Sequence, residues 1–334
     1  MDPLSQGVLG SALPQSLTRN NKNLFIVGVI GFLSGMAPDL DIFIKSTTDP
    51  LLFLEFHRQF THSLIFIPIG GLICASIFYL LFRTIIQLTF KQTFIYATLG
   101  YGTHGLLDAC TSYGTLLLWP FSFERFSWNN ISIVDPLFTL PILFLIIISI
   151  YKKRNFYAKV AMFWAITYLT LGLFLNLYAK NIAQDLINSR GHQSTNITIK
   201  PSLGNLLLWK SIYEYEDFFY TDGIRILPSK KIFNGTRVKK LNIQNSFPNL
   251  DKESQQFKDI QRFAWFSNHH LAISEINPNI IIDARYSLLP NEISGLWGIE
   301  INEHLGQTEH VKFITNRNMS SKRLKMLWDM IWSD

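Results

Sequence analysis

Charged residues and cysteines are both scarce in this chain of 334 residues. Only 16% of the residues are Asp, Glu, Lys or Arg, whereas 48% are hydrophobic. Soluble domains carry about 25% charged residues, so this balance indicates burial in lipid. The two cysteines, Cys74 and Cys110, lie in apolar stretches, and they imply no disulfide framework.

A basic n-region and a nucleic-acid-binding patch are also missing. The first 17 residues contain Asp2 and no basic residue, so we expect no cleavable signal peptide, and insertion through uncleaved segments. The net charge is +6, but the basic residues gather beside apolar runs. That placement is typical of membrane orientation, and we expect no nucleic-acid partner.

Five apolar segments approach the roughly 20 residues needed to cross a bilayer. A sixth candidate, Met1–Leu17, is only moderately apolar and would be short or re-entrant. The sequence therefore predicts a membrane α-helical bundle of five or six spans over residues 1–180. The five segments are Leu24–Ile44, Ser63–Phe82, Thr93–Cys110, Pro136–Tyr151 and Val160–Ala179.

The turns between these segments predict the orientation of the bundle. Three turns carry basic residues and no acid, and alternation of the spans places all three on one face. By the positive-inside rule that face is cytoplasmic. We therefore expect a multi-pass protein of the bacterial inner membrane with its C-terminal part outside the cytoplasm. The basic residues are Arg19, Lys22, Arg83, Lys91, Lys152, Lys153 and Arg154.

Residues 190–334 differ in composition from the rest, because they are rich in Lys, Glu, Asp and Asn and contain no long apolar run. We expect an extracytoplasmic α+β domain here. Ser211–Leu227 predicts a β-hairpin that turns at Asp222-Gly223. Three further strands and one C-terminal helix are predicted at Ile280–Leu288, Leu296–Ile301, His310–Thr315 and Ser320–Trp332.

Two carboxylates, Asp39 and Asp41, follow Pro38 at the end of the first apolar segment. Proline stops or kinks a helix, so the segment should end here. Carboxylates beside hydrocarbon are costly unless water solvates them or a cation neutralises them. The pair is therefore either part of a cation site or a simple polar stop at the interface.

Two histidines, His57 and His62, precede the second apolar segment. Histidine is the commonest metal ligand, and two imidazoles in a short stretch suit a cation that takes nitrogen donors. Arg58 lies between them and could orient a carboxylate or bind an anionic substrate group. The alternative is an interfacial loop with incidental polar residues.

His104 and Asp108 lie four residues apart in the third apolar segment. On a helix this spacing puts both side chains on one face, about 5–6 Å apart at Cβ. They could bind one ion together, or Asp108 could orient a ligand histidine. A mutually satisfied buried pair is the alternative. Asp135 precedes Pro136, an arrangement that is typical of a helix N-cap. A structural role therefore explains Asp135 at least as well as a role in the site.

These motifs should meet at one membrane face. Alternating spans bring together the end of the first segment, the start of the second, the end of the third and the start of the fourth. All three histidines of residues 1–180 belong to this set, namely His57, His62 and His104. The sequence therefore predicts a single site of histidines and aspartates at one end of the bundle.

At these motifs the chain resembles the bacterial inner-membrane metal-dependent hydrolases described as LexA-regulated membrane-bound hydrolases. The resemblance is close over roughly residues 1–150 and loose beyond, where only the trailing extracytoplasmic domain is shared. Many relatives carry a histidine in the N-terminal motif where this chain has Gln6, which can supply an oxygen or orient a water. The matching stretches are Met1–Gly10, Gly35–Asp41, His57–Ser63, Thr103–Thr115, Trp119–Ser122 and Ile133–Pro141.

The resemblance implies hydrolysis assisted by a divalent metal ion, and zinc is the leading expectation. The expected metal ligands are His57, His62, His104 and Asp108. Asp39 and Asp41 are expected as further ligands or as a general base. Arg58 or Arg125 would hold an anionic head group, so the expected partners are membrane lipids and an amphiphilic phosphoester or lipid-linked substrate.

Two other functions compete with hydrolysis. A non-catalytic envelope scaffold or sensor would use the same polar residues to hold helix ends together. A transporter fits less well, because transporters commonly place polar residues near the bilayer midplane, whereas these residues lie at the ends of the apolar segments.

Overall fold

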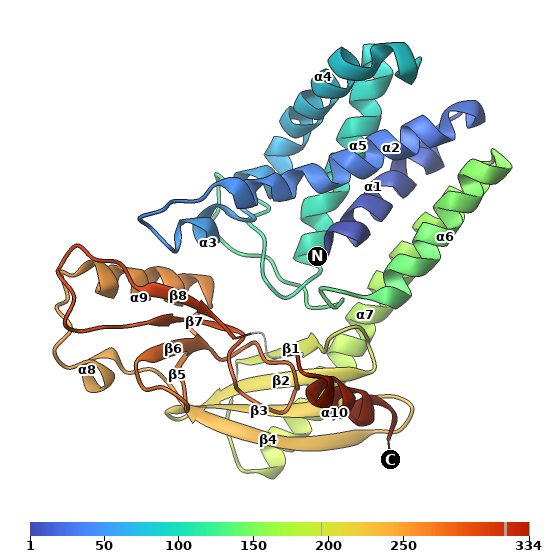
Figure 1. Cartoon of the computed structure of the whole chain (residues 1–334). Helices are drawn as coiled ribbons and strands as arrows, with labels where there is room; N and C mark the ends of the chain where they lie inside the picture. The colour runs from blue at the N-terminus through green and yellow to red at the C-terminus, as the bar shows by residue number, and fades with distance from the viewer. Residues whose placement is uncertain (195, 317–318, 334) are drawn as a thin grey trace. The chain divides into compact units, whose positions relative to one another are not determined.

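The computed structural model describes residues 1–194, 196–316 and 319–333, and it divides into two compact units. The first, which we call the helical unit, comprises Met1–Phe43, Phe56–Phe174 and Leu203–Asn205. The second, the sheet unit, comprises Ile44–Glu55, Leu175–Ser202 and Leu206–Asp334. The chain is thus a helical N-terminal region followed by a β-sheet-rich C-terminal domain (Figure 1).

Each apolar segment that the sequence predicts contains an α-helix, although the first segment is α-helical only to Met36. In chain order the longer helices are α1 (Pro3–Leu17), α2 (Leu24–Met36), α4 (Ile67–Ile86), α5 (Phe90–Ala109), α6 (Pro136–Lys152) and the long α7 (Phe156–Ser189), whose last part belongs to the sheet unit.

Among the residues that the structure describes, three helical segments are long and apolar enough to cross a membrane by length and composition: Asn21–Phe43, Leu64–Ile85 and Phe156–Ser189. The structure therefore does not support the expected count of five or six spans. Helix α1 has 15 residues and α6 has 17, and both are short for a bilayer. Helix α5 has 20 residues, but Lys91, His104 and Asp108 make it less apolar.

Helix α1 lies inside the helical unit, packed against α2, α5 and α6. Glycines allow the backbones to come close. A Cβ atom added at Gly31 of α2 would lie 2.3 Å from the carbonyl oxygen of Gly10 in α1. One added at Gly100 of α5 would lie 2.5 Å from the Gly31 carbonyl oxygen. Small residues at such crossings are the usual basis of helix packing in membranes, and here they bring the N-terminal motif against α5.

Two four-stranded antiparallel sheets form the sheet unit (Figure 1). In each sheet the strands follow chain order. The first sheet contains β1 (Ile197–Pro201), β2 (Leu208–Tyr215), β3 (Phe218–Arg225) and β4 (Lys231–Lys239), and the second contains β5 (Leu271–Ile273), β6 (Ile280–Asp283), β7 (Trp297–Glu300) and β8 (Lys312–Thr315). The sheet unit also contains the helices α8 (Ile243–Ser246), α9 (Gln255–Phe266) and α10 (Ser321–Trp332).

The predicted β-hairpin is present, but its predicted turn is wrong. The chain turns at Glu216 and Asp217, and Glu216 takes the left-handed conformation with φ 51°. Asp222 and Gly223 lie inside β3, where Gly223 pairs with Lys210 on one side and Phe233 on the other. Asp222 instead accepts two hydrogen bonds from the Arg190 guanidinium, at 2.7 and 2.8 Å. Arg190 is distant in sequence, so the local pattern around Asp222 did not reveal this partner.

Segment Ile44–Glu55 belongs to the sheet unit although it precedes most of the helical unit in sequence. Arg262 of α9 donates to both carboxylate oxygens of Asp49, at 3.0 and 2.8 Å, and to Glu55 at 2.5 Å. Partial burial opposes ionisation of Asp49, but Arg262 outweighs it and lowers the Asp49 pKa. These ion pairs hold the segment against α9.

Candidate metal centre

Three short stretches position the polar side chains of the helical unit. After α2 the chain tightens into a 3₁₀ helix, Ala37–Phe43, which carries Asp39 and Asp41. A second 3₁₀ turn, Phe60–His62, ends on His62. His104 and Asp108 lie one turn apart on α5, as their spacing predicts.

Four side chains converge to form what we call the His/Asp quartet: Asp39, His62, His104 and Asp108. The Nε2 atoms of His62 and His104 lie 3.0 Å apart. Asp39 Oδ1 lies 3.4 Å from the first of these nitrogens and 3.3 Å from the second. Asp108 Oδ2 lies 3.4 and 3.8 Å from them.

These separations suit one small cation. Zinc binds nitrogen and oxygen ligands at about 2.0–2.2 Å, so neighbouring ligand atoms of a tetrahedral site lie about 3.3–3.6 Å apart. The five separations between quartet atoms given above run from 3.0 to 3.8 Å and include that range. The donor set, two imidazoles and two carboxylates, is one that zinc and similar divalent ions accept.

Hydrogen bonds fix which nitrogen of each imidazole faces the quartet. His104 Nδ1 lies 2.5 Å from the carbonyl oxygen of Gly35, which can only accept, so His104 donates from Nδ1. Thr61 Oγ1 donates to Asp41 and therefore accepts from His62 Nδ1, at 2.9 Å. Both Nε2 lone pairs then face each other, and they repel unless a cation or proton lies between them.

Asp108 is held from several sides. Its Oδ1 accepts a hydrogen bond from Gln6 Nε2 at 2.8 Å and pairs with the amino group of Met1. Its buried Oδ2 accepts no hydrogen bond of good geometry from any residue that the structure describes. That atom lies 3.0 Å from Arg58 Nε and faces the two imidazoles. A buried carboxylate oxygen left in this state is suited to a positive ligand.

Asp41 and His57, both predicted site residues, lie beside the quartet. Asp41 accepts from His57 Nδ1 at 2.7 Å and from the Arg58 backbone at 3.1 Å. Its Oδ2 lies 3.2 Å from His62 Nδ1. Asp41 thus orients His62, while His57 forms a second group with Asp39 and Asp41 in which ligand atoms lie within 4.8 Å.

The electrostatics of the quartet favour positive charge. His62 is buried, and burial alone would lower its pKa, but Asp108, Asp39 and Asp41 outweigh this and raise it to about 10. The same carboxylates would attract a metal cation to the same place. Arg58, also buried, supplies one fixed positive charge beside Asp108.

One side of the site is open. His62, His104 and Asp108 are buried, whereas the side chains of Asp39 and His57 are 22% and 31% exposed. A molecule that approaches the quartet would therefore meet Asp39 and His57 first.

Both arginines proposed for an anionic head group have partners inside the protein. Arg58 contacts Asp108 and donates to Thr111 Oγ1 at 3.2 Å. Arg125 donates to the Gly114 carbonyl oxygen at 3.0 Å.

Asp135 is the N-cap of α6, accepting from the Phe138 backbone at 3.3 Å and from Tyr168 at 2.8 Å.

Several contacts of the site were not predicted from the sequence, namely the roles of Gly35, Thr61 and the Met1 amino group. Gly35 and Thr61 lie within the stretches that carry the family resemblance. That resemblance could have indicated the two residues, but it could not have indicated which atoms they contact. A third group of possible ligands, Asp49, Asp259 and His310, lies in the sheet unit. Arg262 donates to Asp49 and Asp259 at 3.0 and 2.9 Å and already supplies a positive charge there.

Comparison with known proteins identifies one family. The family model described as YdjM inner membrane protein matches residues 1–183. No curated protein and no solved structure matches the chain. The matched residues include the whole quartet, and the match ends before β1.

Proposed function

Because this chain belongs to the YdjM inner membrane protein family, we propose that it is a membrane-bound hydrolase that uses a divalent metal ion, with zinc as the favoured ion. The observation that carries the proposal is the quartet, in which two imidazole nitrogens and two carboxylate oxygens surround a space of the size of one ion. Membership of the family supports the inner-membrane location, and the quartet supports the chemistry.

His62, His104 and Asp108 are the proposed ligands that the fold holds most firmly, since all three are buried and each is oriented by a further contact. Asp41 positions His62, and Arg58 with Gln6 positions Asp108. A bound divalent ion would polarise the scissile bond and make an attacking water more acidic.

Asp39 is the proposed catalytic carboxylate. It is the one quartet member that is partly exposed, so it can accept a proton from a water molecule at the open side or act as a fourth ligand. His57 lies at the same opening and is bonded to Asp41. We propose an amphiphilic phosphoester or lipid-linked substrate, because the site lies at the end of the segment Asn21–Phe43, which is apolar enough to lie in lipid.

We also propose a multi-pass topology in which α5 and α6 cross the membrane together with the three apolar segments. The seven basic residues of the three turns would then face the cytoplasm, and the quartet and the sheet unit would face outward.

Metal analysis of the detergent-purified protein tests the proposal. We expect one divalent ion per chain, and its loss in His62→Ala and His104→Ala, because each change removes a ligand. His192→Ala is the matched control, since His192 lies in the sheet unit and contacts Tyr213. Stoichiometric metal that is unchanged in both ligand variants would refute the assignment.

A structural role is the second candidate, favoured by the near-complete burial of three quartet members. An ion there would hold α5 to the connections that follow α2 and precede α4 without turnover. Asp39→Asn separates the two functions. If the site is catalytic, this change should abolish hydrolysis of phosphoester substrates, while the three buried ligands His62, His104 and Asp108 retain the metal. A scaffold would keep full function in cells that carry this variant.

A further inference from the structure

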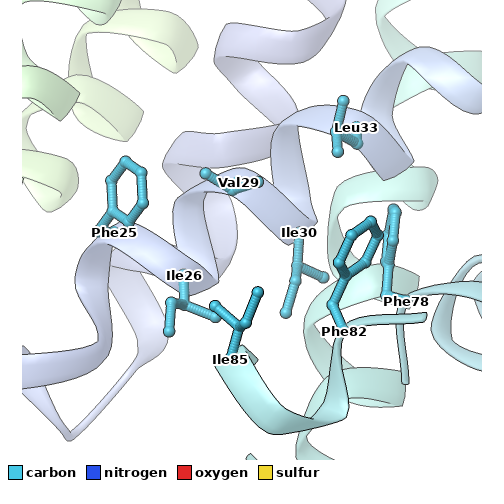
Figure 2. A pocket seen from close by; sticks show the side chains of 8 residues that line it. All are labelled: Phe25, Ile26, Val29, Ile30, Leu33, Phe78, Phe82 and Ile85. Carbon is cyan, nitrogen blue, oxygen red and sulfur yellow. The ribbon is translucent and has the colours of Figure 1, made fainter. Parts of the chain in front are cut away.

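An apolar groove lies between α2 and α4, with a volume of about 220 Å³. Figure 2 shows its lining, in which side chains of α2 from Phe25 to Leu33 face side chains of α4 from Phe78 to Ile85. On each helix the lining residues recur at intervals of three or four, so one face of each helix forms one wall. All eight lining side chains are hydrocarbon.

Lipid is the medium around this groove, because both walls belong to segments apolar enough to cross a membrane, Asn21–Phe43 and Leu64–Ile85. Ile30 is buried at the base, whereas Phe25 and Ile85 are well exposed, so the groove opens away from the protein core. A polar ligand would lose its hydrogen bonds there, and the groove accepts only hydrocarbon.

The position of the groove along α2 relates it to the quartet. Leu33 precedes Asp39 by six residues and Phe25 precedes it by fourteen. With a rise of about 1.5 Å per residue to Met36 and about 2.0 Å over the 3₁₀ residues that follow, the groove lies about 10–23 Å from Asp39 along the chain. Half of the hydrocarbon core of a bilayer is about 15 Å thick, so a lipid chain that starts near Asp39 reaches the groove only with its distal part.

We propose that this groove binds the distal part of one long hydrocarbon chain of an amphiphile whose head group lies at Asp39 and His57. The placement of the head group at Asp39 and His57 rests on the proposed function, whereas the binding of the hydrocarbon chain in the groove does not. The site would then select substrates by chain length: a short chain would end before Leu33 and gain nothing from the groove, and a long chain would enter its near part.

Photocrosslinking tests this inference. The probe is phosphatidylglycerol with a palmitoyl chain that carries a diazirine near its methyl end, added to the purified full-length protein in nanodiscs. A second probe carries the diazirine near the ester. We expect the first probe to label peptides that contain Val29 and Phe82, and the second probe to label them far less.

Val29→Trp fills the groove with a larger side chain. We expect it to reduce labelling of the α4 peptide about tenfold, the effect of a loss of about 1.4 kcal/mol in binding. Leu80→Trp is the matched control, because Leu80 lies on α4, is 76% exposed and does not line the groove. Labelling that Val29→Trp leaves unchanged, or that spreads evenly over lipid-facing positions, would show ordinary surrounding lipid and overturn the inference.

Metal content measured on the same samples separates the two proposals. Val29→Trp should retain the metal of the unsubstituted protein, since Val29 lies outside the quartet. Selective labelling without metal would leave the groove standing and remove the hydrolase proposal. Bound metal without selective labelling would do the reverse.

Discussion

Asp41 links several residues of the site through its two carboxylate oxygens. It accepts hydrogen bonds from His57, from Thr61 and from the Arg58 backbone, and it lies beside His62 Nδ1. A carboxylate in this position sets the orientation and basicity of the imidazole that faces the ion. The sequence left Asp41 open as a ligand or a base, and the geometry favours a positioning role.

Asp41→Asn should therefore weaken metal binding without removing it. Loss of such a supporting carboxylate typically costs 10–100-fold in metal affinity, and we expect an effect of about that size. Competition with a chelator of known affinity measures it. Asp49→Asn is the control, because Asp49 pairs with Arg262 in the sheet unit. Equal affinities in the two variants would contradict the positioning role.

Lys210 predicts a pH dependence of stability in the sheet unit. Burial lowers its pKa from 10.5 to about 7, although Nζ donates to Ser287 Oγ and the Glu292 carbonyl oxygen. Between these two pH values the unfolded chain binds the proton and the folded chain does not. Stability should therefore rise as pH increases through that window. Lys200, its buried cross-strand partner, acts in the same direction.

Thermal unfolding from pH 7 to pH 10 measures this rise. Lys210→Met should reduce the slope and raise the melting temperature at the lower end, where the burial penalty is largest. Lys312→Met should keep the full slope, since Lys312 is largely exposed. A slope that is the same in both variants would contradict the assignment to Lys210.

At the scale of elements, the crossing of α1, α2 and α5 depends on backbone contact. Gly31→Ala would place a methyl group 2.3 Å from the Gly10 carbonyl oxygen, which cannot move as a flexible side chain would. Overpacking of this kind costs about 1–3 kcal/mol. We expect a lower melting temperature in detergent and a lower yield from membranes.

Gly102→Ala is the matched change on α5. Its added Cβ would meet only the Ile67 side chain, at 3.3 Å and beyond. A small effect is expected because that side chain can adjust. If both variants melted at the same temperature, close packing at Gly31 would not be what holds α1 in place.

At the scale of the whole molecule, the proposed orientation can be read by cysteine labelling in intact cells. Both native cysteines are buried. We expect Lys252→Cys, in the sheet unit, to react with a membrane-impermeant maleimide added outside. Lys153→Cys, in the turn between α6 and α7, should react only after permeabilisation. The opposite pattern would show that the protein has the reverse orientation. Equal labelling of the two positions would refute the proposed orientation.

Apolar run length located the helices α2, α4, α5, α6 and α7, because apolar runs of this length are typical of helices buried in lipid. It did not predict the number of spans, since only three segments of the described chain are long and apolar enough to cross a membrane. In the second half, β6, β7, β8 and α10 lie within the segments predicted for them. The prediction of a turn at Asp222-Gly223 was wrong. These residues lie in a strand because they pair with β2 and β4 and because Arg190, which is distant in sequence, binds Asp222.

The sequence by itself determined the set of candidate site residues, because their types and spacings predict cation binding: His57, His62, His104, Asp39, Asp41 and Asp108. Only the tertiary structure decided how these residues divide. It brings four of them to ligand separations and leaves Asp41 and His57 beside them. The reason is that ligand geometry depends on the close approach of α1, α2 and α5 and on bonds to Gly35 and Thr61, which no local pattern encodes.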